Sequence, residues 1–334
     1  MTRGSSLADV GRVLGAIGRI LIAAGVLLLL FVVYQLWGTG LQEARAQDDL
    51  RSQLEASAPS TSTTSSTGPT ATSSRAQQAT TTTAPAKPAP AAVPVPALGE
   101  PIGVIRIPKI GVDKVFVSGV SRDDLRKGPG HYPLTPLPGQ EGNAGIAGHR
   151  TTYGAPFNRI DELQPGDEIL IDAPYGQFRY EVRETTIVSP TQGEVLLDKG
   201  DDRLTLTSCN PKYSARQRIV VSAVLTGTPV GPLKGQAAQE ARLRAQQPEA
   251  DRDDSPVVFG SDLSGSSGPK APVLLWGLVC AAIWAATWFA SRTLGERGQP
   301  RLVRWSPYLV GGPLFLLALY VCFENLANLL PPNF

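Results

Sequence analysis

The sequence predicts a mainly β fold, in which short strands form one closed or nearly closed barrel, together with three transmembrane helices. Three observations lead to this prediction. Strand cues bounded by glycine and proline recur between residues 98 and 228. Three apolar runs are long enough to cross a hydrocarbon core of about 30 Å. The remaining segments are polar or low in complexity, and we interpret them as linkers.

Residues 98–228 form the candidate folded domain outside the membrane. Its clearest strand cues are alternating or β-branched runs at residues 103–107, 115–117, 166–182, 203–209 and 218–225. Helical signals are short here, at residues 121–126, where Ser121 is a candidate N-cap, and at residues 156–163. Many short strands with brief helices are typical of a small barrel.

The apolar runs lie at residues 20–37, 271–291 and 306–330. A cleaved signal peptide is the alternative for the first run, because Ala44-Arg45-Ala46 resembles a cleavage site. The run is longer than the ~7–15 residues of a signal-peptide core, so we favour a retained anchor.

Arginines indicate how these helices are oriented. Three arginines precede the first run, and four arginines face one glutamate in the loop 292–305. The positive-inside rule therefore places residues 1–19 and 292–305 in the cytoplasm. We expect a multi-pass protein of the cell membrane, in contact with the lipid bilayer, whose folded domain is extracytoplasmic.

Two linkers flank the folded segment. Residues 38–97 are dominated by Ser, Thr, Ala and Pro, a composition that buries too little apolar surface to fold. We expect a disordered stalk there that lifts the domain well away from the bilayer. Residues 229–270 form a charged second linker, in which residues 237–246 have the character of a short helix.

Charge and cysteine content narrow the function. A net charge of +2 is too small to indicate a nucleic-acid-binding protein. Of three cysteines, Cys280 and Cys322 lie in apolar runs, whereas Cys209 stands alone in the folded segment. An unpaired cysteine outside the cytoplasm is a candidate reactive thiol, and an inert buried cysteine is the alternative. No dense acidic cluster indicates a calcium site, and we expect neither a cofactor nor a metal.

Cys209 stands at the end of an alternating stretch, because Pro211 cannot continue a central strand. Alternation places the leucines of this stretch on the core face, and Cys209 on the opposite face with Thr205 and Thr207. A nucleophilic thiol needs a proton partner or a positive environment, since only a few per cent of an ordinary thiol is thiolate at neutral pH.

Candidate partners of the thiol are few. The chain has two histidines, His131 and His149, and either is a candidate acid or base. In the last predicted strand, Arg216 and Arg218 share the face opposite to the apolar residues. An arginine beside Cys209 would stabilise an oxyanion, but alternation by itself does not choose between the two.

Three groups of residues together resemble the sortases. They are Thr205-Leu-Thr-Ser-Cys with Arg218 nine residues after the cysteine, Gly148-His-Arg-Thr-Thr-Tyr-Gly-Ala-Pro-Phe, and Gly128-Pro-Gly-His-Tyr-Pro. The resemblance covers residues 102–225. The last two strings, together with Asn210-Pro-Lys-Tyr-Ser-Ala-Arg-Gln-Arg, are most similar to the class E subgroup. The resemblance implies an eight-stranded β-barrel with short helices.

The resemblance also implies a catalytic set, with His149 as acid and base, Cys209 as nucleophile and Arg218 as oxyanion donor. It places Tyr132 and Thr207 at the substrate, and it links Tyr132 to a preference for LAxTG over LPxTG. The implied reaction cleaves a C-terminal sorting signal of a surface protein between Thr and Gly. The cleaved surface protein is then held on the enzyme as a thioester and is transferred to the amine of a cell-wall precursor.

Three alternatives stay open. A pilin-polymerising sortase would use a lysine amine as the acceptor, and an extracytoplasmic cysteine protease or hydrolase would use water. A non-enzymatic surface or wall-binding domain would need no reactive thiol. The two C-terminal spans also depart from the single anchor common in the family.

Overall fold

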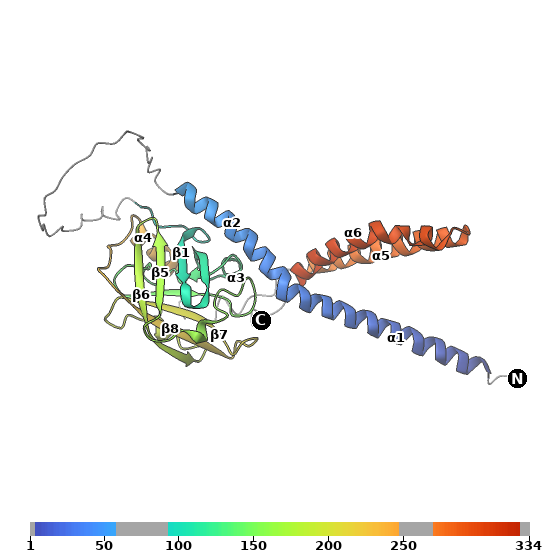
Figure 1. Ribbon diagram of the computed structural model, residues 1–334, viewed down its shortest axis with the longest axis horizontal. Helices are drawn as coiled ribbons and strands as arrows, with labels where there is room; N and C mark the ends of the chain where they lie inside the picture. Colours follow the sequence, from blue (N-terminus) through green and yellow to red (C-terminus); the bar gives the residue numbers. More distant parts are fainter. Residues whose placement is uncertain (1–3, 58–92, 247–269, 328–334) are drawn as a thin grey trace, which may run out of the picture.

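The computed structural model describes residues 4–57, 93–246 and 270–327. They form a β-barrel, one long N-terminal helix and a C-terminal pair of helices (Figure 1). The barrel lies beside the second half of the N-terminal helix. The first half of that helix and the helical pair both extend away from the barrel (Figure 1).

Eight strands close into a barrel in the order β1-β2-β3-β4-β7-β8-β6-β5, so the predicted closed barrel is confirmed. The pairs β2–β3 and β4–β7 are parallel, and the other pairs are antiparallel. The strands are β1 Pro101–Ile107, β2 Val112–Ser118, β3 Gly130–His131, β4 Asn143–Ala147, β5 Glu168–Ala173, β6 Gly176–Val188, β7 Arg203–Asn210 and β8 Gln217–Leu225.

Short helices connect the strands, as predicted. These helices are η3 Pro108–Ile110, α3 Arg122–Leu125, η4 Ile160–Glu162 and η5 Gly193–Leu196, and one more helix, α4 Gln236–Gln246, follows the last strand. Ser121 caps α3 through a capping box with Asp124. The helix expected over residues 156–163 is a single 3₁₀ turn instead. Its buried apolar residues stand three apart, at Phe157, Ile160 and Leu163, which is the spacing of a 3₁₀ helix.

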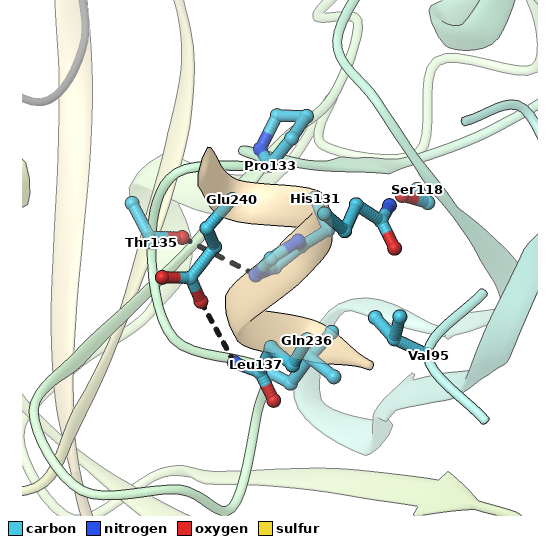
Figure 2. A pocket seen from close by; sticks show the side chains of 9 residues that line it. Val95, Ser118, His131, Pro133, Thr135, Leu137, Gln236 and Glu240 are labelled. Carbon is cyan, nitrogen blue, oxygen red and sulfur yellow. Dashed lines mark hydrogen bonds between the residues drawn. The ribbon is translucent and has the colours of Figure 1, made fainter. Parts of the chain in front are cut away.

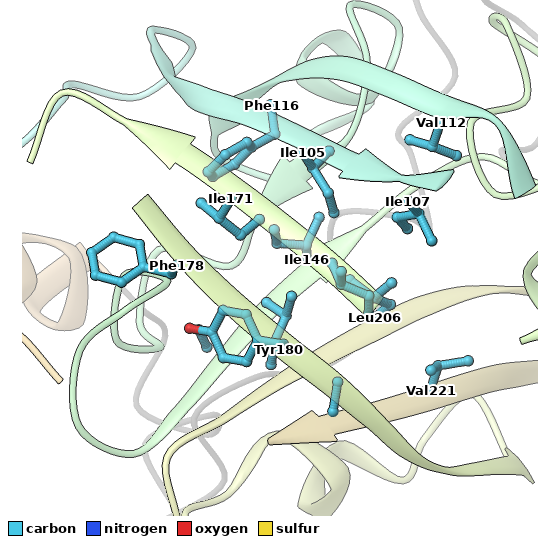
Figure 3. Packing of buried hydrophobic residues seen from close by; sticks show 14 of the residues in the cluster. Ile105, Ile107, Val112, Phe116, Ile146, Ile171, Phe178, Tyr180, Leu206 and Val221 are labelled. Atoms are coloured by element: carbon cyan, nitrogen blue, oxygen red, sulfur yellow. The ribbon is translucent and has the colours of Figure 1, made fainter. Parts of the chain in front are cut away.

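The barrel interior holds the main apolar core. Phe116, Ile146, Ile171, Tyr180 and Leu206 come from five different strands and pack together there (Figure 3). All five are at most 1% exposed, so the strands that carry them are held in one arrangement. The strands β4 and β7 are among them, and the candidate site stands where these two strands end.

The N-terminal helix is continuous, through α1 (Gly4–Val33), the π-helical turn η1 (Tyr34–Gly38) and α2 (Thr39–Ser57). The prediction of a disordered stalk from residue 38 is therefore wrong for residues 39–57, and residues 58–92 lie outside the described residues. Residues 39–57 fold as a helix because one face of this segment is buried, and that face is mostly polar. Thr39, Glu43, Gln47 and Leu50 recur at helical spacing and lie against the barrel.

This contact fixes where the barrel sits along the helix. Glu43 is buried against the barrel and follows Trp37, the last residue of the predicted span, by only about 9 Å of helix rise. The barrel therefore lies beside the end of the first apolar run. The expected long separation between the two does not occur.

Among the residues that the structure describes, three helices are long and apolar enough to cross a membrane, over Ile17–Ser57, Ala271–Glu296 (α5) and Arg301–Ala327 (α6). The predicted loop 292–305 is largely helical. The helix α5 extends to Glu296 and α6 begins at Arg301, so residues 297–300 alone connect them. Tyr34 packs beside Phe323 of α6, and Arg122 of α3 donates a hydrogen bond of 2.8 Å to the Ala327 carbonyl. The ends of the first and third spans thus meet beside the barrel.

Candidate active site

Cys209 and Arg218 stand directly opposite each other on the antiparallel strands β7 and β8. The Arg218 side chain is only 6% exposed, and its Nη1 donates to the carbonyls of Ala215 and Gln217 at 3.0 and 3.1 Å. Arg216 is exposed. Of the two candidate arginines, the structure therefore brings Arg218 to the thiol, with one end of its guanidinium fixed by backbone.

The faces of β7 follow the predicted alternation. Leu204 and Leu206 belong to the barrel core, whereas Cys209 is half-buried at the end of the strand. The threonine face is also covered, because Thr207 is 2% exposed and its Oγ1 lies 3.0 Å from the Tyr132 hydroxyl. The site at Cys209 is thus a partly enclosed position at a strand end, with Tyr132 and Thr207 beside it.

His149 reaches the site from the neighbouring strand. Ala147 pairs with Thr207 in the parallel register of β4 and β7, and the Gly148 amide donates to the Thr207 carbonyl at 3.1 Å. Ser208 Oγ donates to the Gly148 carbonyl at 2.8 Å, which ties the two strand ends together. His149 follows the Ala147–Thr207 pair by two residues on one strand, and Cys209 follows it by two residues on the other, so both belong to the same end of the barrel.

His131 lies elsewhere. It lines a small pocket between the barrel and α4, with Thr135 and Glu240 (Figure 2). Its Nε2 lies 2.8 Å from the Pro136 carbonyl, and burial lowers the pKa of His131 to about 4. A neutral imidazole that donates to this carbonyl ties the loop after β3 together. The structure therefore leaves His149 as the histidine at the thiol.

Burial sets the protonation of the site. It lowers the pKa of His149 to about 4, helped by the positive charges of Arg126 and Arg122. Burial raises the pKa of the Cys209 thiol, and the charges of Arg218 and Arg150 oppose this rise. The dominant form near pH 7 is therefore a neutral thiol beside a neutral imidazole, and a minor fraction holds the thiolate and imidazolium.

Comparison with known proteins identifies this barrel. A sortase-domain family model matches residues 105–226, a range that begins in β1 and ends just after β8 and contains His149, Cys209 and Arg218. The chain belongs to the sortase family. The family's expected barrel is thus the one observed, and the predicted resemblance is confirmed.

Individual relatives match this sortase over parts of their length. Sortase D of Bacillus subtilis is 37% identical over 35% of this chain and 58% of its own length, and Sortase SrtE1 of Streptomyces coelicolor is 31% identical over 62% and 55%. The chain thus spans little more than half of these relatives. The solved sortase E of Streptomyces avermitilis is 33% identical over 46% of this chain and 98% of its own, with a TM-score of 0.36.

The sortase site contains one charged residue that the sequence analysis passed over. Arg150, next to His149, is 3% exposed, and its Nη2 pairs with Asp161 at 2.9 Å. Its Nε and Nη1 are buried and have no hydrogen-bond partner among the described residues. Its charge acts on the Cys209 thiol together with that of Arg218. The Gly148-His-Arg string contains the residue, but no periodic pattern indicates that its side chain turns inward.

Within the described part of the sortase chain, no group of three or more His, Cys, Asp or Glu side chains is placed to hold a metal ion. The chemistry available to the site is that of a thiol, an imidazole and two guanidinium groups. Such a set is suited to nucleophilic attack on a carbonyl with stabilisation of an oxyanion.

Proposed function

We propose that this sortase is a membrane-anchored cysteine transpeptidase that cleaves a C-terminal sorting signal between Thr and Gly and transfers the protein to an amine. The observation that supports the proposal is the pairing of Cys209 directly opposite Arg218, with His149 two residues beyond the Ala147–Thr207 pair at the end of the adjoining strand. Names of the relatives support the same class of reaction.

In the acylation step, the Cys209 thiolate attacks the carbonyl carbon of the Thr–Gly bond. Arg218 stabilises the negative oxygen that forms, because a charged donor beside a developing oxyanion binds it more strongly than the ground-state carbonyl. The His149 imidazolium gives its proton to the glycine nitrogen as the C–N bond breaks. The products are a thioester on Cys209 and a free glycine amine.

In the second step, an amine attacks the thioester carbonyl and His149, now neutral, accepts its proton. The Cys209 thiolate leaves and His149 is again imidazolium, so the reactive ion pair is regenerated. The proposed acceptor is the amine of a cell-wall precursor. A lysine amine of a pilin and water are the competing acceptors, and product analysis separates the three.

The proposed signal is LAxTG rather than LPxTG. Tyr132 supports this assignment, since its hydroxyl is 3.0 Å from Thr207 on the same strand face as Cys209. The Gly128-Pro-Gly-His-Tyr-Pro string around Tyr132 is also one of the three strings that are most similar to class E sortases. We therefore place the chain in that subgroup as part of the proposal.

Peptide ligation tests the proposal directly. The full chain in detergent micelles, incubated with an LAxTG peptide and a glycine amine, is expected to release the C-terminal fragment and form the ligated product. Cys209→Ala is expected to lose both products, because an alanine side chain cannot form the thioester. Hydrolysed peptide without ligation would support a hydrolase instead, and full activity of Cys209→Ala would exclude the proposed mechanism. The same assay with an LPxTG peptide tests the preference for alanine.

The proposed topology has the barrel outside the cytoplasm. The start of α1, which carries Arg12 and Arg19, and the α5–α6 connection both belong to helix ends that extend away from the barrel (Figure 1). In a chain whose own cysteines are replaced, a cysteine at Gln53 is expected to react with a membrane-impermeant thiol reagent on intact cells. A cysteine at Gln299 is expected to react only after the cells are opened. The reverse pattern would overturn this orientation.

A further inference from the structure

The helix α2, which continues the first apolar run, packs along the outside of the barrel. Its Leu50 and Leu54 cover Val104, Val115 and Val117, whose side chains point away from the barrel interior. The strand β2 is therefore buried on both faces, with Phe116 directed inward and the valines on either side of it under α2. Removing α2 would expose this apolar outer face to water.

Gln47 joins α2 to the barrel backbone. Its amide accepts from the Val115 N–H at 2.8 Å and donates to the carbonyls of Val115 and Lys127 at 2.9 and 2.8 Å. Gly128 makes room for this side chain, since a Cβ there would lie 2.4 Å from Gln47 Nε2. The first glycine of the Gly128-Pro-Gly-His-Tyr-Pro string thus serves the approach of α2.

One turn earlier, α2 meets the loop that follows β4. We name residues 148–157 the histidine loop. Glu43 is 1% exposed and pairs with Lys114 at 2.7 Å, and a Cβ at Gly154 would lie 2.3 Å from Glu43 Oε2. The Tyr153 amide donates to Thr39 Oγ1 at 3.3 Å. A polar face of α2 therefore holds the tip of the histidine loop.

The tip of the histidine loop has a backbone conformation that needs such support. Tyr153, Gly154 and Ala155 have φ values of 50°, 70° and 42°, and two of these residues carry side chains that disfavour the left-handed region. The Tyr153 ring lies 5.1 Å from the His149 ring. The position of His149 is thus tied, through Tyr153, to α2.

We propose that α2 is a positioning element of the active site, which holds the histidine loop so that His149 stays at the same end of the barrel as Cys209. Thr39, Glu43 and Gln47 are its positioning residues, and the first membrane helix and the catalytic barrel form one structural unit. The inference rests on the proposed function for its kinetic consequence. The contact between α2 and the histidine loop is independent of that function.

A double substitution, Gln47→Ala/Leu50→Ala, tests the inference in the full chain in detergent micelles. Both residues contact the barrel away from the histidine loop, so the loop itself stays unaltered in sequence. We expect faster hydrogen exchange in peptides covering residues 150–157, and a kcat for sorting-signal cleavage that falls about 10- to 100-fold with little change in KM, because small displacements of a catalytic group cost rate. Ser52→Ala/Gln53→Ala, on the exposed face of α2, is the matched control and is expected to change neither.

The outcomes are separable. Unchanged exchange over residues 150–157 in the Gln47→Ala/Leu50→Ala chain would show that α2 does not hold the loop. Faster exchange with an unchanged kcat would show that the loop does not position His149. Either result overturns the inference. If the unsubstituted chain forms neither thioester nor ligated product, the proposed function fails, and the exchange measurement still decides whether α2 holds the loop.

Discussion

Arg218→Gln is expected to lower kcat/KM for sorting-signal cleavage about 100- to 1,000-fold, the loss typical when one donor to an oxyanion is removed. The expectation follows from the position of Arg218 opposite Cys209 and from the two carbonyls that fix its Nη1. A glutamine neither carries the charge nor reaches as far. The measurement is steady-state cleavage of a sorting-signal peptide by the full chain, with circular dichroism to show that the barrel is folded.

Two further substitutions make this test specific. Arg216→Gln removes an exposed arginine two residues away on the same segment and is expected to change kcat/KM by less than about twofold, since exposed charges contribute little. Arg218→Lys keeps the charge but loses the planar fork, so it is expected to recover only part of the lost activity. A large loss at Arg216 with little loss at Arg218 would contradict the assignment of the oxyanion donor.

The sequence predicted the barrel and the site because both leave local signals. Alternation in β7 places the leucines inside and Cys209 at the strand end, and the proline at 211 marks where the strand stops. The choice of Arg218 over Arg216 was not available from alternation, because both share one face. It needed the spacing of a family motif, and the structure gives the physical counterpart, since only Arg218 is buried opposite the thiol.

The α2 helix could not be predicted in the same way. Its buried face begins with Thr39, Glu43 and Gln47, and hydrophobic periodicity does not register a face that is buried by polar contacts. The complementary signals are two glycines on the barrel, Gly128 and Gly154, which look like ordinary loop residues until their neighbours are known. Such a contact is a property of two surfaces, and neither segment reveals it alone.

The burial of the Arg150 side chain is a second feature that no sequence pattern predicts. An arginine side chain is by default solvated, yet Arg150, beside the candidate histidine His149, is 3% exposed and paired with Asp161. Its effect on the thiol is expected to appear in the ionisation of Cys209. Arg150 therefore affects the pH dependence of the reaction, because its charge favours the Cys209 thiolate, whereas the charges of Arg122 and Arg126 disfavour the His149 imidazolium.

The pH dependence should show a broad plateau, because the reactive form in the proposed mechanism holds a Cys209 thiolate and a His149 imidazolium. With the pKa of His149 lowered to about 4 and that of Cys209 raised, this form is a constant minor fraction between the two values. Below pH about 4, His149 is already protonated and further acid removes the thiolate. Above the raised pKa of the thiol, the imidazolium is lost. We expect kcat/KM to fall on both sides of this plateau.

Thiol alkylation distinguishes this arrangement from a preformed ion pair, which would give the same kinetic profile. If burial raises the pKa of Cys209, alkylation by iodoacetamide should be slow at pH 7 and should accelerate only in the alkaline range. Arg150→Gln and Arg218→Gln are each expected to move that acceleration to higher pH, because both guanidinium charges favour the thiolate. Rapid alkylation at pH 5 to 6 would instead mean that the thiolate dominates, and the protonation states derived from burial would be wrong.

The arginines of α3 act on the histidine instead of the thiol, since Arg122 and Arg126 lower the pKa of His149. Arg122→Gln should therefore raise the acid limb of kcat/KM while leaving the alkylation curve in place.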